Sequence, residues 1–265
     1  MTIFQQVFPW AITATDGLLI KSAAIAASTA SVPIAIHLDH CQDEALVRLA
    51  ADTLPFDSIM VDFSHYEKAE SLAKTAELVA YCHERGIATE AEPGRIEGGE
   101  DGVADTVDME GILTTPEEVE EFIATGVDFL APAVGNVHGE YGRKGPQLDF
   151  ARYVLNRTVV AAWRIFWKQR FDQDCRLERI NKQARGRVRL VLHGTNGFPD
   201  ELTQRCISMG ISKINVNRLV LDDYNTHLHE NASKLPQTQL IEQGTREVVS
   251  MQEHQMKVCG SAGRA

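Results

Sequence analysis

Three histidines occupy equivalent positions in the sequence, since each one lies just after a short apolar run. Side chains in such positions could act together in one site. They are His40, His138 and His193, far apart along the chain. Imidazole nitrogen is a common zinc ligand, and three histidines with one open position are typical of a catalytic rather than a structural zinc site. Each histidine alone could equally be a core or surface residue. The metal interpretation therefore depends on the fold bringing the three runs together.

Aspartate and glutamate residues also lie at the ends of short apolar runs. Asp39 precedes His40 and follows His37 by two residues, so a strand would place Asp39 and His37 on one side. This group suits a metal ion beside a proton-transferring carboxylate, and a structural hydrogen bond is the alternative. Asp62 and Glu92 each end another apolar run. They predict either salt bridges and helix caps or a site for a second cation.

Three further segments suit contacts to a substrate. The segment 94–102, rich in glycine and charge, predicts a mobile loop that carries Glu100. A glutamate on a closing loop can act as a general base, and a merely solvated carboxylate is the alternative. The turns at 194–197 and 215–218 follow the last two apolar runs. In barrels, such loops bind phosphate through backbone N–H groups, and Arg218 adds a cation that an anion could pair with.

The elements that must position these residues alternate between strand and helix. Short apolar runs without helical spacing predict strands buried on both faces of a parallel sheet, and amphipathic stretches between them predict helices. This order predicts an α/β fold of the (β/α)₈ TIM-barrel type, with a doubly wound sheet as the competitor. After Leu219 we expect a closing helix and a tail helix. The predicted strands are 3–7, 32–38, 58–61, 87–91, 128–134, 188–192 and 213–216.

Composition limits the class of protein and its partners. A chain of 265 residues can form one barrel domain, 1–265, and the net charge of −11 argues against nucleic acid as a partner. The five cysteines are widely spaced and odd in number, which indicates a reducing, cytoplasmic location. We expect neither a signal peptide nor a membrane span. The basic segment 153–175 follows no barrel rhythm and is treated as an insertion.

Seven sequence motifs, in order, carry a resemblance to a known family. They are IHLDHC, SIMVDFSH, EAEPGRIEGGEDGV, VGNVHGEYG, LDF, LVLHGTNGFPDE and GISKINVN. Together they resemble the class II, metal-dependent fructose-bisphosphate and tagatose-bisphosphate aldolases.

The resemblance implies a role for each candidate residue. It implies that His40, His138 and His193 bind a catalytic Zn²⁺, that Asp39 transfers a proton, and that Glu100 is the loop base. It implies further that Asp62 and Glu92 form a second site, for a divalent or monovalent cation. The residues implied to contact the dihydroxyacetone phosphate part are Gly139, Gly194, Thr195, Asn196, Asn215, Val216, Asn217 and Arg218.

The implied reaction is reversible cleavage of a ketose 1,6-bisphosphate, fructose 1,6-bisphosphate first, into dihydroxyacetone phosphate and glyceraldehyde 3-phosphate through an enediolate. A homodimer or larger homo-oligomer is implied as well. Lys213, the nearest candidate for a Schiff-base lysine, is predicted to begin its strand and so to face the other rim.

Two departures from the family leave an alternative function open. We expect the family's first strand and helix to be lacking, and 153–175 has no counterpart in the family, which suggests a retained intron of a whole number of codons. The alternative is a truncated, non-catalytic barrel that acts only as an interaction or oligomerisation protein.

Overall fold

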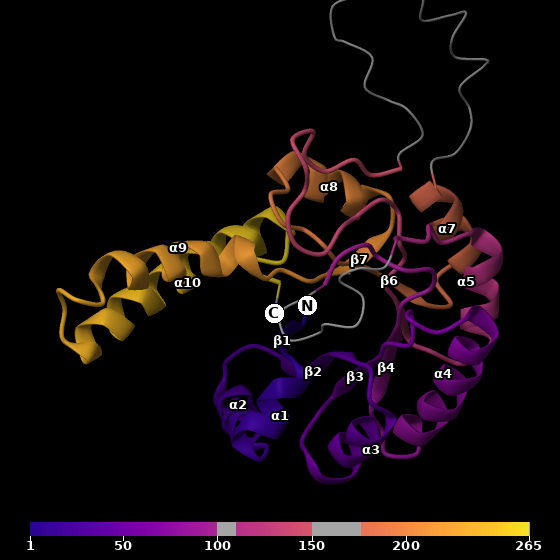
Figure 1. Cartoon of the computed structure of the whole chain (residues 1–265), viewed down its shortest axis with the longest axis horizontal. Coiled ribbons are helices and arrows are strands. Elements are labelled where there is room, and N and C mark those ends of the chain that lie inside the picture. Colours follow the sequence, from indigo (N-terminus) through magenta and orange to yellow (C-terminus); the bar gives the residue numbers. More distant parts are fainter. Residues whose placement is uncertain (100–109, 150–175, 265) are drawn as a thin grey trace, which may run out of the picture.

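A sheet of seven parallel strands forms the centre of the protein, in a computed structural model that describes residues 1–99, 110–149 and 176–264. The strands follow one another in the sheet in chain order, as successive β-α-β units require. The sheet curls and helices surround it, a TIM-barrel-like arrangement that confirms the predicted α/β class (Figure 1). The strands are β1 (Ile3–Val7), β2 (Ile34–Cys41), β3 (Ser58–Val61), β4 (Ala88–Ala91), β5 (Phe129–Leu130), β6 (Arg189–Leu192) and β7 (Ile211–Ile214).

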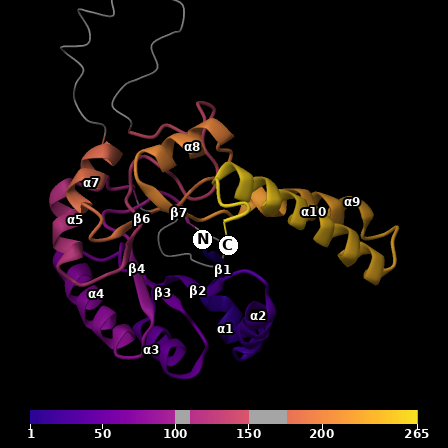
Figure 2. The ribbon, with the colours of Figure 1, turned by 180° about the vertical axis from the view of Figure 1, so that it is seen from behind.

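Most helices lie along the outside of the sheet, but the last two form an arm. Figures 1 and 2 both show α9 and α10 packed together and extending away from the barrel. These are the helices predicted after Leu219. The helices are α1 (Pro9–Thr15), α2 (Leu18–Thr29), α3 (Glu44–Thr53), α4 (Lys68–His83), α5 (Pro116–Ile123), α7 (Arg176–Ala184), α8 (Asp200–Ser208), α9 (Arg218–Asn231) and α10 (Gln237–Val258). Within the described part, none of them is long and apolar enough to cross a membrane.

Local sequence signals explain where several helices begin and end. Thr115 starts α5 with a capping box: its hydroxyl accepts from the backbone N–H of Glu118, and the Glu118 carboxylate accepts from the N–H of Thr115. Just beyond the ends of α4 and α5, Gly86 and Gly126 have φ of +72° and +87°, which glycine adopts without steric cost. All three signals depend only on neighbouring residues of the sequence.

The apolar core has two parts, one outside the sheet and one inside the barrel. Leu38 of β2 and Leu78 of α4, both fully buried, belong to the layer between sheet and helices. Met60, Ala131 and Val191 form a smaller cluster of buried residues from the other part. The polar residues of the strand ends lie beside this smaller cluster, so the fold must accommodate charge close to its core.

The outer strands β1 and β7 form no backbone ladder with each other within the described residues. Side chains connect them instead, because the ring of Phe4 lies 5.3 Å from Nζ of Lys213. The described sheet thus has seven strands where the TIM-barrel prediction implied eight, and the predicted lack of a first strand and helix stays a prediction. The insertion 153–175 lies outside the described residues.

Three strands differ most from their predicted boundaries, while β4 and β6 each begin one residue later than predicted. Strand β2 extends through Cys41 rather than ending at residue 38. Strand β5 is much shorter than 128–134, because side chains replace the ladder: the N–H of Ala133 donates to Oγ1 of Thr114. Strand β7 begins at Ile211, directly after the turn at Gly210, rather than at Lys213.

Candidate active site

A bulge in β2 brings Asp39 and His40 into the same site. The pairing of β2 with β3 shifts register between Leu38 and Cys41, and His40 has φ of +46°. Strict alternation would send residues 39 and 40 to opposite faces of the sheet, whereas both contact the site. A left-handed non-glycine residue costs roughly 1–2 kcal/mol, so the surrounding contacts must hold His40 there. The prediction that His40 lies just past the strand is wrong, since it lies within the bulge.

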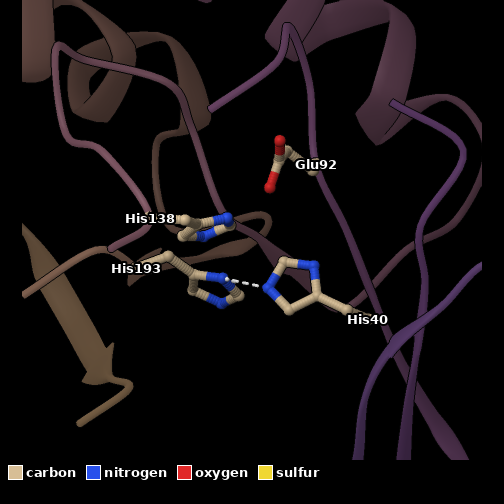
Figure 3. A group of neighbouring side chains, drawn as sticks. All are labelled: His40, Glu92, His138 and His193. Atoms are coloured by element: carbon tan, nitrogen blue, oxygen red, sulfur yellow. Dashed lines mark hydrogen bonds between the residues drawn. The ribbon is translucent and has the colours of Figure 1, made fainter. Parts of the chain in front are cut away.

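Four buried side chains converge at the strand ends (Figure 3). His40, Glu92, His138 and His193 each offer a ligand atom, and these atoms lie within 4.8 Å of one another. The four residues come from β2, the end of β4, and the loops after β5 and β6. Nε2 of His40 is 3.0 Å from Nδ1 of His193, and each side chain is buried. The structure therefore brings the three predicted histidines together and adds Glu92 to them.

Asp62 supports this cluster from behind His40. Its Oδ2 lies 2.9 Å from Nδ1 of His40, and its Oδ1 accepts from the backbone N–H of Ser64. This contact leaves Nε2 of His40 facing the other histidines, the arrangement in which a carboxylate orients a metal-binding imidazole. The predicted pair is therefore divided between two positions: Glu92 joins the histidines, and Asp62 contacts His40.

The electrostatics of the cluster favour a cation. Burial raises the pKa of Glu92 to about 8, and the charge of Asp62 adds to the effect. Burial would lower the pKa of His40, but Asp39 and Asp62 outweigh it and raise that pKa to about 10. Burial also holds the pKa of His138 well below its usual value, so this imidazole is neutral and able to donate a lone pair.

The donor set fits a zinc ion. Three imidazoles and one carboxylate are ligands that zinc accepts in a tetrahedral or slightly larger shell. Oε2 of Glu92 is buried and has no hydrogen-bond partner among the described residues, so the folded chain leaves this oxygen without a donor. A bound cation would satisfy that oxygen and offset the carboxylate charge.

Asp39 is held beside the cluster by amide donors. Gln6 donates through Nε2 to Oδ2 of Asp39 at 2.9 Å, and Asn215 donates through Nδ2 to both oxygens at 3.2 and 3.3 Å. Burial would raise the pKa of Asp39, but His40 and His37 outweigh it and keep the pKa well below its usual value. Asp39 is therefore an ionised, oriented carboxylate that can accept a proton.

A second buried layer lies beneath the cluster, and the sequence reasoning missed it. Glu90 of β4 contacts His193 through Oε1 at 2.8 Å and Lys213 of β7 through Oε2 at 2.7 Å. Nζ of Lys213 is also 3.4 Å from Nε2 of His37. The prediction that Lys213 begins its strand and faces the other rim is wrong: it is the third residue of β7 and is buried. The signal was present, because Glu90 and Lys213 each precede a site residue by two and so share its face.

Three loops that carry the predicted substrate contacts lie side by side. Tyr141 ties two of them together: its hydroxyl accepts from the N–H of Val137 and donates to the carbonyl of Gly194. Nδ2 of Asn196 donates to the carbonyl of Gly139 at 3.0 Å. The hydroxyl of Thr195 donates to the carbonyl of Asn215, which connects the third loop.

The remaining predicted residues are placed less directly. Val216 and Asn217 are half-buried and lead into α9. Arg218 is half-exposed, and its guanidinium pairs with the carboxylates of Glu140 and Asp222 rather than facing an open anion site. Glu100 lies outside the described residues.

Comparison with known proteins agrees with this geometry. The chain matches the class II fructose-bisphosphate aldolase family over residues 2–264. A Coccidioides immitis (strain RS) protein, provisionally named a fructose-bisphosphate aldolase, is 50% identical over 265 residues, covering 97% of this chain and 80% of that protein. The fructose-bisphosphate aldolase of Geobacillus stearothermophilus is 36% identical over 242 residues, or 89% of this chain and 73% of the relative.

A solved structure shows the same fold. The crystal structure of a Coccidioides immitis protein, also provisionally named a fructose-1,6-bisphosphate aldolase, superposes with a TM-score of 0.87 at 51% identity. The alignment covers 98% of this chain and 83% of that one. The protein is thus a carbon–carbon lyase by class, and the chain belongs to the class II fructose-bisphosphate aldolase family.

Proposed function

We propose that this protein is a zinc-dependent aldolase that reversibly cleaves a ketose 1,6-bisphosphate. Fructose 1,6-bisphosphate is the proposed first substrate, with dihydroxyacetone phosphate and glyceraldehyde 3-phosphate as products. The observation that carries the proposal is the convergence of His40, Glu92, His138 and His193 on one buried centre next to the ionised Asp39.

The three histidines would hold Zn²⁺, with Glu92 as a further ligand. The ion, when bound, supplies Lewis-acid stabilisation of the negative charge that develops on the substrate oxygens during cleavage. Burial of these ligands supports this role, because electrostatic interactions are stronger away from bulk water. A second divalent or monovalent cation near Asp62 and Glu92 belongs to the proposal as well.

Asp39 would accept the proton of the substrate's C4 hydroxyl as the carbon–carbon bond breaks. Its low pKa keeps it ionised, and the amides of Gln6 and Asn215 orient its two oxygens. A positioned base of this kind contributes about 10²–10⁴-fold to the rate. We assign return of a proton to the product carbon to Glu100, on the family resemblance alone.

The three adjacent loops would bind the phosphate of the dihydroxyacetone phosphate part. Hydrogen bonds join these loops, from Asn196 to Gly139 and from Thr195 to Asn215. Backbone N–H groups of such loops, which include Gly194 and the 215–218 turn, suit a phosphate. For Arg218 to take part, phosphate must displace a carboxylate from its guanidinium.

A cleavage assay with metal control tests the function. The purified chain is stripped with a chelator, reloaded with Zn²⁺, and given fructose and tagatose 1,6-bisphosphates, which differ in C4 stereochemistry. We expect chelator-sensitive triose phosphate release that Zn²⁺ restores. Asp39→Asn should bind Zn²⁺ yet lose cleavage, which separates proton transfer from metal binding. Folded, metal-loaded protein without activity would instead support the non-catalytic barrel.

We further propose a single domain over 1–265, a cytoplasmic location, and assembly as a homodimer or larger homo-oligomer. The widely spaced cysteines support the location. Light scattering of the purified protein tests the assembly state.

A further inference from the structure

The buried layer beneath the metal cluster contains an ion pair with a task in that cluster. Glu90 is fully buried, and its two carboxylate oxygens have different partners. Oε1 lies 2.8 Å from Nε2 of His193, and Oε2 lies 2.7 Å from Nζ of Lys213. The pair spans the sheet, since Glu90 belongs to β4 and Lys213 to β7, three strands further along.

Nε2 of His193 has two polar neighbours at 2.8 Å, Oε1 of Glu90 and Nδ2 of Asn215. A carboxylate only accepts hydrogen bonds, so the contact with Glu90 is the one that favours a proton on Nε2. Nδ1 then keeps its lone pair and faces Nε2 of His40 in the cluster. Without Glu90, the neutral ring could place its proton on either nitrogen, and Nδ2 of Asn215 would be the polar neighbour left at Nε2.

Lys213 makes this arrangement stable, and it also occupies the inner layer. A buried carboxylate without a cation is costly, and removal of one partner of a buried pair leaves the other uncompensated. His37, Asp39 and Glu90 could by themselves hold a metal ion. The ammonium of Lys213 already lies against two of them, 2.7 Å from Glu90 and 3.4 Å from His37.

We propose that Glu90, held in place by its contact with Lys213, is the positioning residue that fixes His193 for metal binding. In the inner layer, the ammonium group of Lys213 therefore supplies the positive charge, whereas the outer cluster would bind an added metal ion. This inference rests on the proposed metal-dependent function. It concerns groups that reach the metal only through His193, and neither Glu90 nor Lys213 contacts the reacting atoms.

Zinc affinity measured against folding tests the proposal. Lys213→Met, Glu90→Gln and the double variant are prepared metal-free. Their Zn²⁺ affinity is measured by competition with a chromogenic chelator, and their folding by thermal unfolding. We expect Lys213→Met to weaken Zn²⁺ binding by about 10- to 100-fold, the usual effect of losing a group that orients a ligand. The double variant should recover much of this loss, because a neutral glutamine oxygen can still accept from His193.

The controls separate the possible failures. Glu120→Gln removes a surface carboxylate that pairs with Arg187, so it should keep wild-type Zn²⁺ affinity. Wild-type affinity in folded Lys213→Met, or no recovery in the double variant, overturns the positioning role while leaving the metal function intact. If Lys213→Met does not fold, the double variant is compared with Glu90→Gln, and tighter binding by the double variant supports the role while equal or weaker binding overturns it. Wild-type protein that binds no Zn²⁺ refutes the proposed function itself.

Discussion

Replacement of Gly194 by alanine should break the contact between the two loops that carry His138 and His193. Gly194 has φ of +64°, and a methyl group there would lie 2.4 Å from the backbone oxygen of Val137 and 2.8 Å from its carbonyl carbon. The obstacle is backbone rather than a flexible side chain, so the segment that leads to His138 must shift. The methyl group therefore affects both stability and the metal cluster.

Gly197→Ala is a matched control from the same loop. Gly197 has φ of +65°, but nothing lies within 4 Å of an added methyl group. It carries only the left-handed backbone cost of roughly 1–2 kcal/mol, partly offset by the less flexible unfolded chain. Gly194→Ala adds an overpacking cost of about 1–3 kcal/mol, for a total destabilisation of about 2–5 kcal/mol before that offset.

Urea unfolding of the metal-free proteins measures both costs, and chelator competition measures Zn²⁺ affinity. Gly194→Ala should unfold at lower urea concentration than Gly197→Ala and bind Zn²⁺ more weakly, whereas Gly197→Ala should keep wild-type affinity. Equal stability and equal affinity of the two variants would refute the reasoning, because the backbone conformation would then account for the whole effect.

Three further outcomes follow from the structure. His138→Ala should lose bound Zn²⁺ and cleavage activity while it keeps a wild-type circular dichroism spectrum; retained activity would overturn the ligand assignment. Because burial raises the pKa of Glu92 from 4.5 to about 8, folding favours its protonated form, so metal-free protein should lose thermal stability as pH rises from about 5 to 8. Saturating Zn²⁺ should remove that decline, and a decline unchanged by Zn²⁺ would argue against Glu92 as a ligand. Thr115→Ala removes the hydroxyl that caps α5 and should cost about 1 kcal/mol in urea unfolding, without a change in Zn²⁺ affinity.

The sequence was sufficient for features that depend on nearby residues. Alternating apolar runs and helical stretches gave the order of the elements, because each period follows from local backbone geometry. The capping box at Thr115 and the glycine after α4 are equally local. The positions of the histidines after apolar runs were also readable, since the carboxyl ends of parallel strands lie at one edge of a sheet.

The tertiary structure alone decided the contacts that join distant strands. The bulge at His40 depends on the pairing of β2 with β3, and no residue type within β2 predicts it. Glu90 and Lys213 lie 123 residues apart, so only the curl of the sheet brings their charges together. A four-residue strand such as β7 is too short for its ends to be predicted from periodicity. If the predicted strand is displaced by two residues, each side chain stays on the same face of the sheet but lies at a different position along the strand. The three histidines of the proposed metal site could therefore be named from the sequence, whereas the ion pair beneath them required the fold.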